Sequence, residues 1–165
     1  MSERKSAFAP EAGPHTRVLI LGSLPGEASL AARQYYAHPR NLFWRLIGAV
    51  IGQPDLPALP YPQRLEHIAA RGIGLWDVIA SARRQGSLDT AIRAVEAAPL
   101  ADLAASLPSL QAIAFNGAKS AALGRKALAG NQLRLIDLPS SSPAHAAMCY
   151  EDKLARWMVL KDFLA

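Results

Sequence analysis

The chain has 165 residues, of which 51% are hydrophobic, and it carries a formal net charge of +5 with one cysteine. This length suits a single globular domain with a full core. The lone Cys149 excludes an internal disulfide and a cysteine-rich metal or iron–sulfur centre, and no apolar run reaches the roughly 18 residues of a transmembrane helix. The positive charge favours an acidic partner such as nucleic acid, but a basic domain that binds none fits it equally well.

The first half of the chain predicts a tail, one strand and two helices. Residues 1–16 are charged and have no apolar stretch, so we expect a flexible tail rather than a signal peptide, in a cytoplasmic protein. A buried strand follows at 17–21 and ends in Gly and Pro. Apolar residues at helical spacing predict a helix over 39–51, with Pro39 as its first residue. After a proline-rich connector, a second helix is predicted over 63–71.

The second half alternates three further strands with three further helices. Strands are predicted over 72–79, 110–117 and 132–139, and helices over 100–106, 118–129 and 150–164. Such alternation predicts a parallel sheet with helices on both faces. Ligands bind at the carboxyl ends of the strands in such sheets. Here those ends run into the polar loops GSLPGEAS, WDVIASARR, FNGAKS and LPSSSPAH, whose Gly, Ser, Asn and Pro suit contacts to phosphates.

Two short stretches approach known motifs without matching them. In NGAKS, Ala118 separates Gly117 from Lys119, whereas a P-loop has Lys directly after its second Gly. In GSLPG, Ser23 directly follows Gly22, so the G-x-S-x-G nucleophile elbow is absent. The loops also lack a cluster of carboxylates or histidines. We therefore expect neither ATP binding nor a metal hydrolase, and no cofactor.

Four blocks of the chain, LGSLPGEASL, YYAHPRNLFW, FNG and LPSSSPAHA, resemble the uracil-DNA glycosylase superfamily in order and spacing. Within it they are most similar to the hypoxanthine-DNA glycosylases, often called family 6, and YYAHPRNLFW is also similar to the HPxNRFW block of mismatch-specific uracil glycosylases. The resemblance implies one domain over 17–165, a three-layer α/β/α sandwich on a four-stranded parallel sheet. It also implies a monofunctional base excision repair enzyme. Such an enzyme hydrolyses the N-glycosidic bond of a deaminated base flipped out of DNA and leaves an abasic site.

The resemblance also implies roles for individual residues. Asn41 is the expected catalytic residue, because its amide oxygen can hold a water near the anomeric carbon. The alternative for Asn41 is helix capping. With Pro39 as the first helical residue, Asn41 would lie in the first turn, where the positive end of the helix favours a departing base anion or a phosphate. Tyr36 is expected to stack on the flipped base. Asn116 is expected to read the base edge, although Asn before Gly also marks turns.

The remaining expected site residues contact either the base or the DNA strand. Leu24 and Phe43 complete the base-binding set. The expected DNA-binding residues are Gly22, Ser23, His38, Lys119, Ser140, Ser141, Ser142 and His145. Asp77 ends a strand and is expected either to order the pocket loop or to bond backbone amides. Trp44 and Trp76 are expected in the core.

The chain departs from the superfamily pattern at three positions. Leu24 stands where uracil glycosylases have a catalytic Asp or Asn, and Leu138 stands where they have a His. Ser142 takes the place of a Leu that wedges the duplex in relatives, which leaves Met148 or His145 as substitutes. Two alternatives to an enzyme of this kind therefore stay open, a non-catalytic damaged-DNA-binding module and a small-molecule nucleosidase. The resemblance favours hypoxanthine over uracil or xanthine, in double- or single-stranded DNA, and we expect a monomer without a membrane partner.

Overall fold

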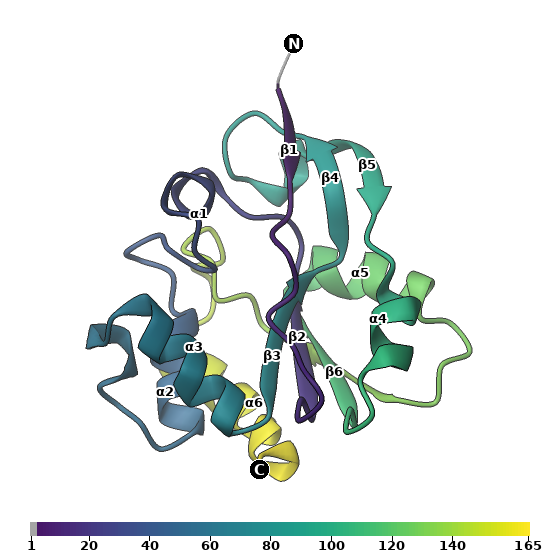
Figure 1. The fold of residues 1–165 in the computed structure, drawn as a ribbon. Coiled ribbons are helices and arrows are strands. Elements are labelled where there is room, and N and C mark those ends of the chain that lie inside the picture. The colour runs from purple at the N-terminus through teal and green to yellow at the C-terminus, as the bar shows by residue number, and fades with distance from the viewer. Residues whose placement is uncertain (1–2) are drawn as a thin grey trace.

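The computed structural model describes residues 3–165 and is built around a parallel sheet (Figure 1). Its strands, in spatial order, are β3 (Ile73–Asp77), β2 (Val18–Gly22), β6 (Ala112–Asn116) and β7 (Arg134–Leu138). Gly22 pairs with Asp77, and Asn116 pairs with Leu138, so the carboxyl ends of the strands lie level at one edge. The expected four-stranded parallel sheet is confirmed.

Helices cover both faces of this sheet, because alternate side chains of each strand point to opposite faces. In β2, Val18 and Ile20 enter one apolar cluster, and Leu19 and Leu21 enter the other. The first cluster is covered by α2 (Phe43–Val50), η1 (Leu56–Ala58), α3 (Tyr61–Ala70), α6 (Tyr150–Trp157) and η3 (Met158–Phe163). The second is covered by α4 (Leu100–Ser106) and α5 (Ala118–Ala127). This is the expected α/β/α sandwich.

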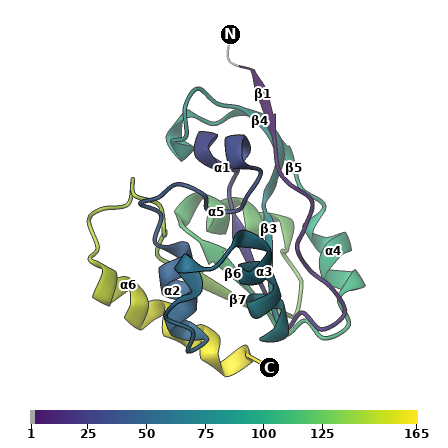
Figure 2. The same cartoon turned by 60° about the vertical axis from the view of Figure 1, so that its left-hand side comes forward.

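A small antiparallel sheet extends the molecule beyond the carboxyl ends of the parallel strands. It consists of β1 (Arg4–Ser6), β4 (Ile79–Arg83) and β5 (Arg93–Ala97), in the order β1-β4-β5, with η2 (Asp89–Ala91) between β4 and β5. The helix α1 (Glu27–Ala32) and the loop before α6 lie toward this same end (Figure 2). The extension therefore carries the 84–92 segment to the edge of the sheet where a ligand is expected.

The N-terminal segment differs from the flexible tail expected over 1–16. Residues 1 and 2 lie outside the described part of the chain, but residues 3–16 belong to the fold. Arg4–Ser6 pairs with β4, the Trp76 indole N–H donates to the Phe8 carbonyl at 2.9 Å, and the Glu11 amide donates to the Leu75 carbonyl at 2.9 Å. These contacts use mostly backbone groups, so the lack of an apolar pattern gave no sign of them.

Other predicted boundaries also shift. The helix expected from Pro39 begins at Phe43. The residues before it form turns, in which the backbone N–H of Asn41 donates to the His38 carbonyl at 2.9 Å. The strand expected over 72–79 is interrupted at Val78, after which β4 begins. The helix expected over 150–164 continues past Trp157 only as a 3₁₀ helix. Within residues 3–165, no helix is long and apolar enough to cross a membrane.

Candidate active site

A cavity of about 740 Å³ opens at the carboxyl edge of the parallel sheet. Its walls come from the loops after β2, β4, β6 and β7 and from the turn before α2. This volume lies in the range of small-molecule sites and is more than large enough for a base with its sugar. Three of the four loops that the sequence predicts to converge line the cavity, namely GSLPGEAS, FNGAKS and LPSSSPAH, whereas the fourth, WDVIASARR, mostly forms β4 and contributes only Asp77.

Nearly all of the expected site residues line this cavity. They are Gly22, Ser23, Leu24, Tyr36, His38, Asn41, Asn116, Lys119, Ser140, Ser141, Ser142 and His145. Phe43 is the exception, because it is fully buried in the core and lies behind Tyr36, with the two rings stacked at 3.9 Å between centroids. The expectation that Phe43 contacts the base is therefore corrected, since the ring supports Tyr36 instead.

Tyr36 adopts an unusual backbone conformation, with φ at 56°. This left-handed region costs a bulky residue about 1–2 kcal/mol. Neighbouring bonds hold it, because the Tyr35 amide donates to the Tyr61 hydroxyl at 3.0 Å and the Ala37 amide donates to Ser29 Oγ at 3.1 Å. Strain of this kind persists where the surroundings over-determine a site. The half-buried ring of Tyr36 thus forms a fixed wall of the cavity.

Asn41 lies two residues before α2, not in its first turn as expected. Its Oδ1 accepts the backbone N–H of Phe43, two residues on, at 2.9 Å, but the N-cap of α2 is Leu42 and has no side-chain cap, so Asn41 is not the N-cap of the alternative hypothesis. An amide oxygen has two lone pairs, and its NH₂ has two protons. One lone pair and the NH₂ group therefore remain available to the cavity. The Leu42 amide donates to the Ser141 carbonyl at 3.0 Å, which ties this turn to the loop after β7.

The amide of Asn116 is bonded at both ends to Ser141. Asn116 Nδ2 donates to Ser141 Oγ at 2.9 Å, and the Ser141 amide donates to Asn116 Oδ1 at 2.9 Å. Both side chains are buried. Gly117 follows with φ at 99°, a conformation that favours glycine, and a Cβ there would lie 3.2 Å from Ser140 Cβ. Asn116 thus joins the ends of β6 and β7, and only its second lone pair and second proton are left for a ligand.

Two side chains of α6 donate hydrogen bonds to backbone carbonyls of the serine-rich loop after β7. The buried Lys153 ammonium donates to the His145 carbonyl at 2.7 Å, and the Trp157 indole N–H donates to the Pro139 carbonyl at 2.9 Å. Burial lowers the pKa of Lys153. Ser142 Oγ accepts the Ala144 amide at 3.2 Å, so its hydroxyl proton remains free to donate. The loop therefore presents hydroxyl donors on a braced backbone.

Comparison with known proteins identifies the family. A family model of the uracil DNA glycosylase superfamily matches residues 9–163. The chain belongs to this superfamily. It is 44% identical over 117 residues to a hypoxanthine DNA glycosylase of Methanosarcina barkeri, covering 71% of this chain and 73% of that protein. A hypoxanthine DNA glycosylase of Methanosarcina acetivorans is 38% identical over 141 residues, or 86% of this chain and 88% of the relative.

The fold is also similar to a solved structure of the superfamily. The solution NMR structure of a Methanosarcina acetivorans protein, described as a candidate uracil DNA glycosylase, superposes with a TM-score of 0.86 at 34% identity. The superposition covers 96% of this chain and 97% of that one. Both layers of helices and the parallel sheet are therefore features of the superfamily fold.

At the two positions where uracil glycosylases have polar catalytic groups, this superfamily member has apolar side chains. Leu24 is buried, packs in the cluster under α4 and α5, and lines the cavity. Leu138 is buried in the opposite cluster. Neither can activate water, so the polar groups of the cavity come from other elements. Within residues 3–165, no group of three or more His, Cys, Asp or Glu side chains is placed to hold a metal ion.

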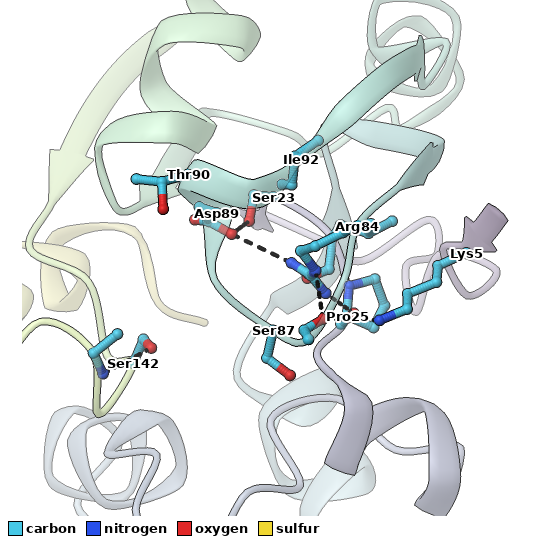
Figure 3. A network of polar contacts seen from close by, with 12 residues as sticks. Lys5, Ser23, Pro25, Arg84, Ser87, Asp89, Thr90, Ile92 and Ser142 are labelled. Carbon is cyan, nitrogen blue, oxygen red and sulfur yellow. Dashed lines mark hydrogen bonds and ion pairs between the residues drawn. The ribbon is translucent and has the colours of Figure 1, made fainter. Parts of the chain in front are cut away.

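A buried arginine that the sequence analysis missed fixes the loop after β2 (Figure 3). The Arg84 side chain is completely buried, donates to the carbonyls of Leu24 and Pro25, and pairs with Asp89 at 3.5 Å. Ser23 Oγ donates to Asp89 Oδ1 at 2.7 Å, so the hydroxyl expected on a phosphate is already bonded within the protein. The segment SARRQGSLDT is predicted as a polar loop, but its first three residues belong to β4, and Arg84 follows directly after that strand.

Asp77 is the second residue that sequence reasoning underrated. It ends β3, is 4% exposed and lines the cavity. A Cβ built on Gly22 would lie 2.6 Å from Asp77 Oδ1, so the carboxylate fits only beside a glycine. Burial, and then the charge of Asp89, raise the pKa of Asp77 to about 7, against a smaller opposite effect of Arg84. In the described part of the chain, Oδ2 has no hydrogen-bond partner.

Proposed function

We propose that this chain is a DNA glycosylase that hydrolyses the N-glycosidic bond of a deaminated base, with hypoxanthine as its preferred substrate. The observation that carries the proposal is the cavity, which gathers residues from the four sequence blocks that resemble the superfamily around one space with room for a base. The relatives at 38% and 44% identity are hypoxanthine DNA glycosylases, which supports hypoxanthine as the substrate. Its partner is DNA, and we place it in the cytoplasm as a monomer.

The base must leave the helix before it can react, because its glycosidic bond is unreachable in the stack. The Tyr36 ring, backed by Phe43, is rigid enough to receive the flipped base face to face. Such stacking is worth about 1–3 kcal/mol per base. Outside the cavity mouth, the Ser140 and Ser142 hydroxyls and the Lys119 ammonium would contact phosphates, and the half-buried His38 and His145 would contact the same strand.

Hydrolysis then needs a positioned water rather than a strong base. Bond cleavage through an oxocarbenium-like state sends the electron pair of the C1′–N9 bond to the departing purine. Asn41 Oδ1, oriented by the Phe43 amide, would accept a hydrogen bond from a water and aim the water oxygen at C1′. The water oxygen bonds to C1′ as the C1′–N9 bond breaks, and the proton that the water loses neutralises the departing purine anion. Correct placement alone can supply several kcal/mol of the barrier. The contact with the Phe43 N–H and the catalytic role are therefore compatible, since each uses a different lone pair of Asn41 Oδ1.

The test compares labelled duplexes with one hypoxanthine, uracil or xanthine, followed by alkaline cleavage of abasic sites. We expect wild type to cut the hypoxanthine strand, and Asn41→Ala to lose about 100-fold or more in single-turnover rate. Asn131→Ala is the matched control, because Asn131 Oδ1 also accepts the amide two residues on, Leu133 N–H at 2.8 Å, but on an exposed turn outside the cavity.

The outcomes separate the three hypotheses. Full activity in Asn41→Ala would remove Asn41 from the reaction. Lesion binding by wild type without base release would indicate the non-catalytic module, with Leu24 and Leu138 as its explanation. Cleavage of free deoxynucleosides but not of DNA would indicate a nucleosidase.

A further inference from the structure

The cavity contains a buried acceptor that the reaction described above does not use. Asp77 is 4% exposed, and its Oδ2 has no hydrogen-bond partner within residues 3–165. A buried polar atom without a partner is costly, and native proteins rarely tolerate one without a functional reason. The carboxylate faces a cavity that we propose to hold a base. A hydrogen-bond donor on that base would satisfy it.

The Asp77 carboxylate borders the cavity and packs against Gly22. Gly22 has no side chain, and a Cβ there would lie 2.6 Å from Asp77 Oδ1 and 3.1 Å from the Tyr36 hydroxyl. The carboxylate and the end of the stacking ring therefore lie against the same glycine. Asn116, the residue expected to read the base edge, has one donor and one acceptor position already bonded to Ser141. Asp77 is the better-placed free acceptor beside the ring on which the base would stack.

We propose that Asp77 is a specificity residue, whose carboxylate accepts the ring N–H that deamination creates on the base. This inference rests on the proposed function. Adenine presents a bare lone pair at N1, and cytosine presents one at N3. Hypoxanthine and xanthine carry N–H at N1, and uracil carries it at N3. A carboxylate therefore attracts hypoxanthine and uracil and repels the lone pairs of their parents, adenine and cytosine, whereas guanine, the parent of xanthine, already carries N–H at N1.

The charges that face Asp77 act in opposite directions. Asp89 and the buried surroundings favour the protonated carboxyl, whereas Arg84 favours the carboxylate. A base N–H aimed at the carboxylate would add to the effect of Arg84, because a hydrogen bond to the charged form stabilises that form. Binding of a deaminated base thus favours the state that recognises it. Adenine or cytosine would instead place the lone pair of a ring nitrogen against the carboxylate, so that two acceptors face each other.

The test measures single-turnover cleavage of two duplexes, one with hypoxanthine and one with unsubstituted purine, which lacks the N–H and keeps the N1 lone pair. For Asp77→Ala we expect hypoxanthine cleavage to fall about 10- to 100-fold, as for a lost hydrogen bond to a charged group. Cleavage of the purine duplex should stay unchanged or rise, because its N1 lone pair gains nothing from the carboxylate and is repelled by it. Asp137→Ala is the control, since Asp137 also lies near a strand end but is exposed and outside the cavity.

Equal losses on both duplexes would show that Asp77 is only structural and would overturn the inference. If Asp77→Ala does not fold, Asp77→Asn replaces it. The ratio of hypoxanthine cleavage to purine cleavage should still fall, because the NH₂ group of Asn can donate to the bare N1 of purine. An unchanged ratio would overturn the inference. If wild type binds the hypoxanthine duplex without cutting it, the proposed function fails. The ratio of binding affinities for the two duplexes, in wild type and variant, then decides on Asp77.

Discussion

Replacing Asp77 with Asn should stabilise the protein in a way that depends on pH. The folded state holds this carboxyl in a buried site with a pKa of about 7, against 3.8 for an unperturbed group. Asn has nearly the same shape but no charge to bury. The substitution therefore removes the cost of ionising a buried acid, a cost consistent with a site selected for recognition rather than stability.

The sign and size follow from proton linkage. Between pH 3.8 and about 7 the folded protein holds more protons on Asp77 than the unfolded chain does, so stability falls as pH rises through this window. Above about pH 7 the whole cost is present. Because one pKa unit corresponds to about 1.4 kcal/mol, the advantage of Asp77→Asn over wild type should grow by about 2.5 kcal/mol between pH 5 and pH 8.

Urea unfolding of wild type and Asp77→Asn at these two pH values measures this difference directly. The same pair of measurements on Asp137→Asn, an exposed carboxylate, controls for general effects of charge on the fold. An advantage of equal size at pH 5 and pH 8 would refute the reasoning, since it would mean that folding does not raise the pKa of Asp77.

Two further substitutions test the supports of the site. Arg84→Met should lower the free energy of unfolding by about 2–3 kcal/mol, because the Leu24 and Pro25 carbonyls and Asp89 lose their donor. This loss is smaller than for a fully buried ion pair, because Asp89 is half exposed. Chemical denaturation measures it, and a loss below about 0.5 kcal/mol would contradict the role of Arg84. Tyr36→Ala should weaken binding to a lesion duplex by about 10-fold or more, and an unchanged affinity in a fluorescence titration would remove the stacking role.

The sequence was enough to predict the parallel sheet and the edge at which the site lies. Strands such as VLILG are buried on both faces and read as continuous apolar runs, and the polar loops that follow them must meet at one edge. Residues within those loops were therefore placed in the cavity correctly. Phe43 was the error, because helical spacing does not tell whether an aromatic ring faces a cavity or packs behind the ring that does.

What could not be predicted depends on contacts between segments far apart in the chain. Nothing in the local sequence pairs Asn116 with Ser141, or turns Arg84 inward to the loop after β2. The burial of Asp77 depends on its register with Gly22 across two parallel strands, and the strand pattern alone does not specify that register. Backbone pairing of Arg4–Ser6 was missed for a similar reason, since its side chains carry no pattern.

The apolar residues at Leu24 and Leu138 need not mean that the site has lost its chemistry. A parallel sheet brings the ends of neighbouring strands to one cavity, so a polar group can reach the same space from any of several loops. In this chain the amide of Asn41 comes from the turn before α2, and the carboxylate of Asp77 comes from the end of β3. Leu24 lines the same cavity and, because its side chain is apolar, offers that carboxylate no hydrogen bond that would compete with a base. Leu24→Asn should therefore lower the ratio of hypoxanthine cleavage to purine cleavage, even though it adds a polar group to the cavity. A rise in this ratio would contradict the argument.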